Sequence, residues 1–191
     1  MKPILLLHGA LGTAHQLQSL ATLLSTERDV HTLTFTGHGD STAPASGGYS
    51  FDTFANDILE YLAANNLAQV DIFGYSMGGY AALYFALKHP EKVGKIATLG
   101  TKVVWTAEGS AQEVKMLNAD KLEEKVPAYA DKLKALHGAT DWRNMLAATA
   151  QMMLDLGNNP LLKEEHYKAI QHEVLLGIGD KDHTAGLEDT V

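Results

Sequence analysis

The sequence predicts an α/β protein of three layers, αβα, in which a mostly parallel sheet carries an inserted helical segment. Three observations support this fold class. Short apolar runs rich in β-branched residues alternate with helical patterns in the first half of the chain. Turns that contain glycine or histidine follow these runs directly. A long helical stretch then interrupts the alternation before one more apolar run.

Five apolar runs are expected to form the sheet. The run at 3–7 is apolar throughout, which is typical of a parallel strand buried on both faces. The other four predicted strands are 30–35, 69–73, 93–99 and 174–178. Helices are expected at 13–25, from residue 51 onward, and at 80–88 before the stop at His89-Pro90. One face of the first helix is expected to carry Leu17, Leu20, Leu23 and Leu24.

Residues 102–172 carry helical patterns at 111–117, 122–136, 142–156 and 163–172. We expect these helices to form a lid, because an insertion that leaves the carboxyl end of a strand starts at the edge where parallel sheets bind ligands. The alternative is a helical subdomain away from the site. The predicted domains are a core of 1–101 and 173–191 and a lid insertion of 102–172, with 187–191 as the first turn of another helix.

Composition indicates a globular protein that does not bind nucleic acid. The chain has 191 residues, of which 46% are hydrophobic and 20% charged, and its net charge is −8. A negative chain lacks the basic surface that neutralises phosphates, and a sequence without cysteine has no disulfide or thiolate metal site. With neither a signal-peptide core nor a run of membrane-spanning length, we expect a cytoplasmic protein with no membrane partner.

The segment 74–79, Gly-Tyr-Ser-Met-Gly-Gly, lies between a predicted strand and a predicted helix. A G-x-S-x-G sequence in this position predicts a nucleophile elbow, a turn so sharp that the residues two before and two after the serine must be glycine. Such a turn exposes the hydroxyl of Ser76. It also places the N–H of Met77 at a helix N-terminus, where developing negative charge is favoured.

Five motifs in order resemble the α/β-hydrolase family over residues 3–191, namely 5–9, 37–41, 74–79, 89–93 and 179–182. The resemblance implies Ser76 as the nucleophile and Asp182 as the acid of a catalytic triad, with Asp180 as the competing choice. It implies an oxyanion hole formed by the N–H groups of Ala10 and Met77, and it implies no metal or cofactor. In one motif the sequence departs from the family, because Thr34 and Thr36 stand where an aspartate and often a proline are usual.

The family's general base is a histidine on a loop after one more strand, beyond the helix that begins near residue 187. His183 would have to double back from the turn of Asp182 itself, and the other histidines precede that loop. His8 and His38 are expected to hold loops by hydrogen bonds. We therefore expect a longer protein to complete the triad. The alternative is a naturally short relative that binds ligands without catalysis.

The resemblance implies a serine hydrolase that cleaves a small-molecule ester through an acyl-enzyme on Ser76. Acyl transfer and C–C hydrolysis use the same scaffold, and non-catalytic ligand binding is the alternative class. The sequence does not identify the acyl chain or the oligomeric state. The expected pocket residues are Leu11, Tyr75, Trp105 and Trp142, with Met145, Met152, Met153, Tyr49 and Phe51 as further candidates.

Overall fold

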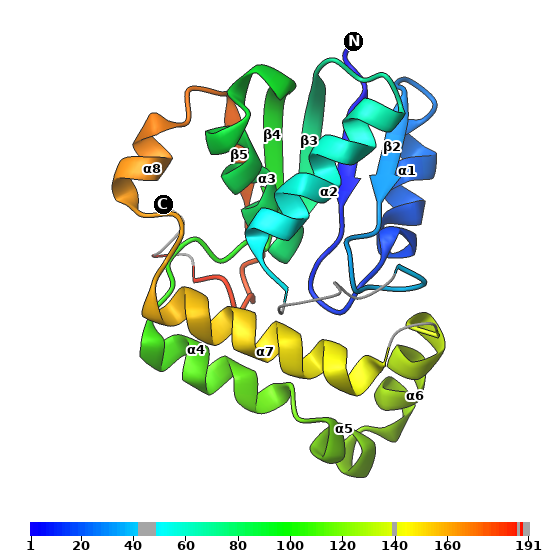
Figure 1. The fold of residues 1–191 in the computed structure, drawn as a ribbon, viewed down its shortest axis with the longest axis vertical. Helices are drawn as coiled ribbons and strands as arrows, with labels where there is room; N and C mark the ends of the chain where they lie inside the picture. The colour runs from blue at the N-terminus through cyan, green and yellow to red at the C-terminus, as the bar shows by residue number, and fades with distance from the viewer. Residues whose placement is uncertain (42–48, 139–140, 187, 189–191) are drawn as a thin grey trace.

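The computed structural model describes residues 1–41, 49–138, 141–186 and 188. In this part of the chain, five strands form one sheet in the order β2-β1-β3-β4-β5, and every neighbouring pair is parallel. This arrangement confirms the predicted fold class, and it brings the carboxyl ends of all five strands to one edge of the sheet (Figure 1). The strands are β1 (Ile4–Leu7), β2 (Val30–Leu33), β3 (Val70–Tyr75), β4 (Val93–Leu99) and β5 (Val174–Gly177).

The register of the sheet aligns the turns that follow the strands. Leu7 is level with Leu33 on one side and Gly74 on the other, and Leu99 is level with Gly177. The chain order reverses between β1 and β3, which lie side by side while their connections run to opposite sides of the sheet. The carboxyl ends of strands at such a reversal form a crevice that binds ligands in open α/β sheets.

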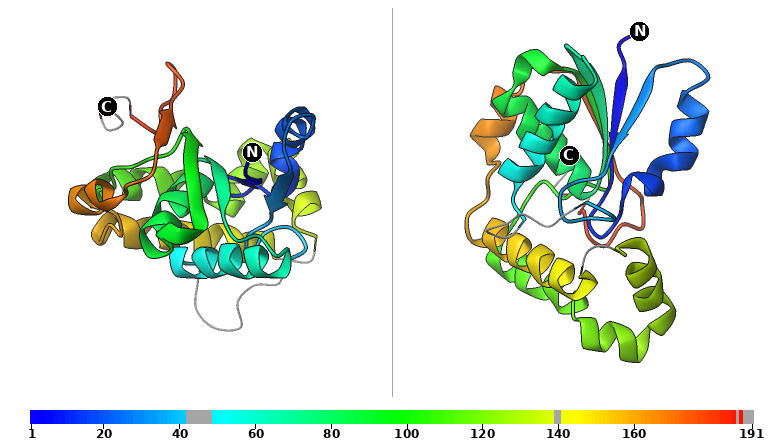
Figure 2. Two further views of the ribbon diagram at one scale, coloured as in Figure 1. Left: turned by 90° about the horizontal axis from the view of Figure 1, so that it is seen from above. Right: turned by 45° about the vertical axis from the view of Figure 1, so that its right-hand side comes forward.

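Helices cover both faces of the sheet (Figure 2). The helices α2 (Phe51–Ala64) and α3 (Met77–Lys88) lie on one face. On the other face lies α1 (Gln18–Leu24), which follows a 3-10 turn at Ala14–Leu17. Most of the predicted apolar face of α1 packs against the sheet, but Leu23 is 69% exposed. The prediction for Leu23 was wrong because it lies roughly 80° around the helix from the centre of the stripe formed by the other leucines.

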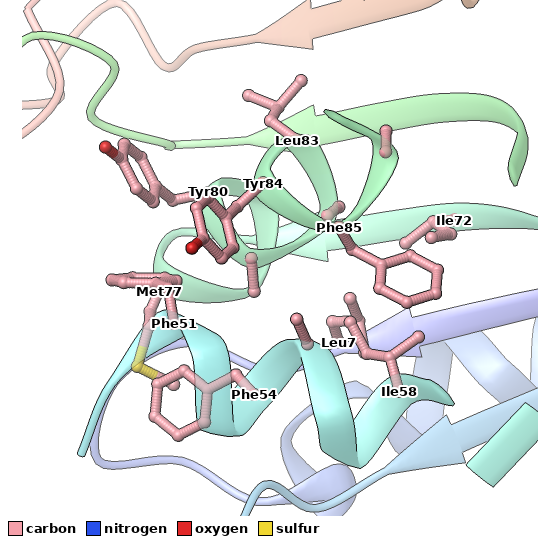
Figure 3. Close-up of a cluster of buried hydrophobic side chains, with 14 of the residues drawn as sticks. Leu7, Phe51, Phe54, Ile58, Ile72, Met77, Tyr80, Leu83, Tyr84 and Phe85 are labelled. Carbon is pink, nitrogen blue, oxygen red and sulfur yellow. The ribbon is translucent and has the colours of Figure 1, made fainter. Parts of the chain in front are cut away.

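The main core lies between α2, α3 and the sheet (Figure 3). Phe54, Ile58 and Leu62 recur along one side of α2 and are fully buried, as their spacing predicts. The facing helix α3 is buried for ten consecutive residues from Met77 to Ala86. This packing anchors the first turn of α3, and therefore Ser76, against the interior of the protein.

Between β4 and β5 the described chain is helical, with α4 (Ala107–Glu113), a 3-10 turn (Val114–Met116), α5 (Ala119–Lys125), α6 (Pro127–Leu136), α7 (Trp142–Asn158) and α8 (Glu164–Ala169). Figure 1 shows α4 and α7 side by side across the edge where the strands end. The single helix predicted at 122–136 is wrong. The chain breaks at Val126, because Pro127 cannot continue the preceding helix but fits the first turn of a new one.

The last part of the insertion returns to the core. The N–H of Leu162 donates to the hydroxyl of Tyr80 at 3.0 Å, and the hydroxyl of Tyr167 donates to the carbonyl of Val103 at 2.8 Å. The helix predicted at 163–172 ends earlier, at Ala169. Of the helical turn predicted at 187–191, all but residue 188 lies outside the described residues. Among the helices that the structure describes, none has the length and hydrophobicity that crossing a bilayer requires.

Candidate active site

Ser76 joins β3 to α3 in a backbone conformation that residues with side chains rarely adopt. Its φ is 50° and its ψ is −116°, and a non-glycine residue in such a region costs about 1–3 kcal/mol. Four hydrogen bonds hold the turn, one of them from the N–H of Tyr80 to the carbonyl of Ser76 at 3.3 Å. The N–H of Ser76 donates to the carbonyl of Leu99 at 2.9 Å, and its carbonyl accepts from the N–H of Gly79 at 2.9 Å and from the hydroxyl of Thr101 at 3.0 Å.

The two glycines of the motif are required by close backbone packing. A Cβ on Gly74 would overlap the backbone of Gly78 and Gly79, and a Cβ on Gly78 would overlap the carbonyl of Leu7. The strand β1, the end of β3 and the first turn of α3 therefore meet with no space for a side chain between them. This packing is the geometry that the G-x-S-x-G sequence predicts.

The loop after β1 lies directly beside the elbow. A Cβ on Gly9 would be 3.3 Å from the Cβ of Ser76, so the next residue, Ala10, is a neighbour of the serine. Gly9 is held by a bond from its N–H to the side chain of Gln16 at 2.9 Å. Among the bonds between described residues, neither the N–H of Ala10 nor that of Met77 donates to a protein acceptor. Ala10, Ser76 and Met77 line the same cavity, so both N–H groups are candidates for binding a negative oxygen there.

Asp182 follows β5 and reaches the same edge of the sheet. Its Oδ1 accepts from the N–H of Thr184 at 2.8 Å and of Ala185 at 2.9 Å. Its Oδ2 would be 3.1 Å from a Cβ on Gly100, the residue after β4. The carboxylate is thus fixed through one oxygen, while the other lies next to the loop that borders the elbow. Asp180 is exposed and makes no such contact with the described residues.

Ser76 lines a cavity of about 170 Å³ between the sheet edge and the inserted helices. Its wall is mostly apolar. The predicted residues Ala10, Leu11, Met77 and Trp105 all line it. Further residues of the wall come from α2, α3, α4 and α7 and from the segments beside them, namely Phe51, Tyr80, Lys102, Glu113, Met116, Leu117, Thr149, Met152, Met153, Leu156 and Thr184.

Four of the residues predicted for the pocket lie elsewhere. Tyr75 packs against Gly9 and Gly100 and is 36% exposed. Trp142 is buried among residues of the inserted helices, in one cluster with Leu133 of α6 and Leu146 of α7. The reason is the direction of α7, whose first turns pack on α6 while only its later turns reach the cavity. Met145 is likewise buried in the main core, and Tyr49 lines a separate groove.

Three polar wall residues were missed by sequence reasoning. Lys102 and Glu113 form an ion pair whose side chains are each 15% exposed, and Thr149 is fully buried. The pairing joins a residue after β4 to the end of α4. No motif or periodicity in the sequence connects these three residues, because only the fold of the insertion brings them together.

Three buried histidines hold the loops around the site. His8 donates from Nδ1 to the carbonyl of Gly9 at 2.8 Å and accepts at Nε2 from the N–H of Phe35 at 3.1 Å, so its ring is neutral. Burial, followed by the charge of His38, lowers the pKa of His8 to about 3. Burial also lowers the pKa of His38 to about 4, and its Nδ1 lies 3.3 Å from the carbonyl of Thr36. Both rings therefore brace loops, as predicted.

His137, at the end of α6, connects the inserted helices to these loops. Its Nδ1 accepts from the N–H of Gly39 at 2.8 Å, and its Nε2 lies 3.1 Å from the carbonyl of Leu11. Its ring is 6.0 Å from that of His38, and burial lowers its pKa. One imidazole thus joins the loop after β1, the loop after β2 and the insertion.

Comparisons with known proteins agree with this architecture. Residues 2–180 match the family model described as alpha/beta hydrolase fold. Among solved structures, a 2-hydroxy-6-oxo-6-phenylhexa-2,4-dienoate hydrolase from Rhodococcus aligns with a TM-score of 0.77 and 20% identity over 98% of this chain and 76% of that one. A carboxylesterase structure from Nitrososphaera gargenis aligns with a TM-score of 0.73 and 17% identity, over 94% of this chain and 72% of that one.

Curated relatives match over shorter stretches. An ethanol acetyltransferase from Kluyveromyces marxianus is 34% identical over 95 residues, which are 48% of this chain and 25% of the relative. An sn-1-specific diacylglycerol lipase from Mus musculus is 32% identical over 128 residues, which are 65% of this chain and 41% of the relative. The chain therefore spans less than half the length of these two curated relatives.

Proposed function

Because this chain belongs to the α/β-hydrolase fold family, we propose that it hydrolyses carboxylic esters through an acyl-enzyme on Ser76. One observation carries the proposal. Ser76 is held at φ 50° on the wall of an apolar cavity, beside the N–H groups of Ala10 and Met77. A strained serine, two backbone donors and an apolar cavity are what acyl transfer to a hydroxyl requires.

The proposed reaction has two steps. The Ser76 hydroxyl attacks the ester carbonyl, a base takes its proton, and the alcohol leaves. Water then attacks the acyl-enzyme and releases the acid. In each step the N–H groups of Ala10 and Met77 bind the developing oxyanion, which typically contributes about 2.7–4 kcal/mol for each donor. Asp182 orients the base through Oδ2, because Oδ1 is engaged with backbone N–H groups.

The base in this mechanism is a histidine. The histidines that the structure describes near the site are not available for this role. His8, His38 and His137 are bound to loop backbone atoms, and His183 is exposed next to Asp182. We therefore do not assign the role of the base to any of the residues that the structure describes. Free imidazole in the buffer can stand in for such a base, which gives the proposal a direct test.

The helices α4–α7 act as a lid in this proposal. They cover the edge of the sheet where Ser76 lies, and their span supplies Met116, Leu117, Met152, Met153 and Leu156 to the wall of the cavity. A cavity of about 170 Å³ is close to the roughly 150 Å³ that holds a benzene molecule. The proposed substrate therefore has a short acyl or alcohol group, of about six non-hydrogen atoms, in this space.

The first experiment measures the reactivity of Ser76. We expect a fluorophosphonate probe to label the wild-type chain and not the Ser76→Ala variant. We also expect imidazole to accelerate hydrolysis of p-nitrophenyl hexanoate by the wild type above the rate with Ser76→Ala, which corrects for direct catalysis by imidazole. Absence of both labelling and imidazole-dependent turnover would contradict hydrolysis and favour a ligand-binding role.

Acyl transfer to an alcohol is the second candidate, favoured by the 34% identity to an ethanol acetyltransferase. The same acyl-enzyme would then react with an alcohol instead of water. With ethanol present, formation of ethyl hexanoate faster than hexanoic acid would support transfer. A product that remains hexanoic acid would support hydrolysis.

A further inference from the structure

Two residues that line the apolar cavity beside Ser76 each carry a buried polar atom that lacks a partner in the described part of the chain. Among the described residues, no hydrogen bond is made by Nε1 of Trp105 or by Oγ1 of Thr149, although both residues line the cavity. Thr149 is 0% exposed. Buried donors and acceptors are rarely left unpaired, since each loses its bonds to water. Two such atoms on residues that line one cavity point to a ligand that carries the missing partner.

Neighbouring groups fix the position of Trp105. The ring of Tyr80 meets it edge-on at 6.2 Å, and the ammonium of Lys102 lies 5.3 Å from the centre of the indole. Thr149 is on α7, one turn before Met152 and Met153, which line the same cavity. Thr149 is therefore on an ordered helix, and Trp105 lies in the segment between β4 and α4, in contact with Tyr80 and Lys102.

The charges of the wall are already neutralised. Lys102 and Glu113 are the charged residues among the described lining, and they pair with each other. A ligand carboxylate would have to displace Glu113 from Lys102, and a ligand ammonium would have to displace Lys102 from Glu113. Because both displacements leave a partly buried charge without its partner, the wall favours an uncharged ligand.

We propose that the group bound in this cavity is an acyl chain that carries an uncharged oxygen, such as a keto carbonyl, with Trp105 and Thr149 as specificity-determining residues. This inference rests on the proposed ester-binding role of the cavity. The indole N–H only donates, and the threonine hydroxyl donates or accepts. A carbonyl oxygen accepts from both kinds of group, so it satisfies atoms that a plain hydrocarbon chain leaves unpaired.

The test compares methyl hexanoate with its 3-, 4- and 5-oxo derivatives, which differ only by the exchange of one CH₂ for C=O. Turnover is measured with the wild type in imidazole buffer, and dissociation constants are measured with Ser76→Ala. We expect at least one oxo ester to be preferred by about tenfold or more, as for a site built to hydrogen-bond its substrate. We expect monomethyl adipate, which carries a carboxylate, to bind more weakly than that oxo ester.

Thr149→Val removes the hydroxyl with little change of shape, and Trp105→Phe removes the indole N–H together with one ring. In Thr149→Val or Trp105→Phe, the preference for the oxo ester should fall by about tenfold, while the control Met153→Leu retains it. The inference is overturned if the wild type shows no preference, or if both variants keep it. Thr149→Val should also unfold at the wild-type temperature or above it, since it removes an unpaired hydroxyl. A lower unfolding temperature would show that the hydroxyl is bonded within the protein.

The two readouts separate this inference from the proposed function. If Ser76 is unreactive and no ester is turned over, the hydrolase proposal fails. The dissociation constants of Ser76→Ala, alone and combined with Thr149→Val or Trp105→Phe, still decide whether the cavity selects an uncharged oxygen.

Discussion

At the residue scale, the conformation of Ser76 depends on the glycines around it. The positive φ of Ser76 costs free energy, and hydrogen bonds to Leu99, Gly79 and Thr101 offset this cost. The turn closes only because Gly78 lets the first turn of α3 touch the carbonyl of Leu7. The bond from Gly79 is local in sequence. The contacts with Leu99, Thr101 and Leu7 depend on the neighbouring strands, so the motif predicts the turn but not all the contacts that hold it.

Replacement of Gly78 by alanine tests this dependence. A Cβ there would overlap backbone rather than a flexible side chain, so β1 or α3 must move. We expect Gly78→Ala to lower the free energy of unfolding by about 3 kcal/mol, despite the better helix propensity of alanine. Urea denaturation measures the change.

Gly138→Ala is the matched control, because a Cβ at Gly138 meets no described atom within 4 Å. It should change the free energy of unfolding by less than about 0.5 kcal/mol. Equal stabilities of the two variants would contradict the close packing assigned to Gly78.

At the element scale, α7 combines two roles along one helix. Its first turns pack against α6 through Trp142 and Leu146, and its later turns form the cavity wall with Met152 and Leu156. The helix begins at Asp141, whose carboxylate accepts from the N–H groups of the next turn. Apolar spacing predicts a helix, but it does not tell which half of it faces a ligand.

Loss of the cap should destabilise α7. Asp141 accepts from the N–H of Arg143 at 2.9 Å and of Asn144 at 3.3 Å. We expect Asp141→Ala to lower the free energy of unfolding by about 1 kcal/mol, the usual cost of a lost N-cap. Asp131→Ala is the control, since Asp131 is an exposed residue of α6 with only a 3.4 Å contact to Lys134, and it should cost less than about 0.5 kcal/mol. A similar loss in both variants would argue against the cap.

At the scale of the whole molecule, buried histidines join segments that are far apart in the sequence. His8 links the loops after β1 and β2, and His137 links both loops to the inserted helices. His38 lies between them, 5.1 Å from the ring of His8 and 6.0 Å from that of His137. All three have lowered pKa values, so the folded protein holds them neutral.

This arrangement predicts a loss of stability in mild acid. Above pH 6.5, the ordinary pKa of histidine, the rings are neutral in the folded and unfolded states alike. Below it these histidines bind protons in the unfolded chain but stay neutral in the folded protein, because the folded pKa is about 3 for His8 and about 4 for His38. The free energy of unfolding should therefore fall as the pH drops, by up to about 1.4 kcal/mol per pH unit for each histidine.

Urea denaturation at about pH 7.5 and about pH 5 measures this dependence, in a range where most carboxylates remain ionised. We expect the free energy of unfolding of His38→Gln to fall less between the two pH values than that of the wild type, because one of the histidines with a lowered pKa is gone. Equal wild-type stability at the two pH values would exclude this role for the histidines.

The order of strands and helices and the elbow could be predicted because they depend on local features. An apolar run, a proline or a pair of glycines around a serine restricts the backbone where it stands. The break before Pro127 has the same local cause, although the prediction treated 122–136 as one helix. The exposure of Leu23 follows from its angular position on the helix, away from the stripe of the other leucines.

By itself, the sequence determined the α/β fold class, the sharp turn at Ser76 and the gathering of loops at one edge of the sheet, since these follow from short-range backbone sterics and parallel strand direction. Only the tertiary structure decided which side chains line the cavity. Lys102, Glu113 and Thr149 are brought to it by the path of the inserted helices, and Trp142 is kept from it. The physical reason is that cavity walls are made by packing between segments that are distant in the sequence, and no periodic pattern of residues in the sequence predicts such packing.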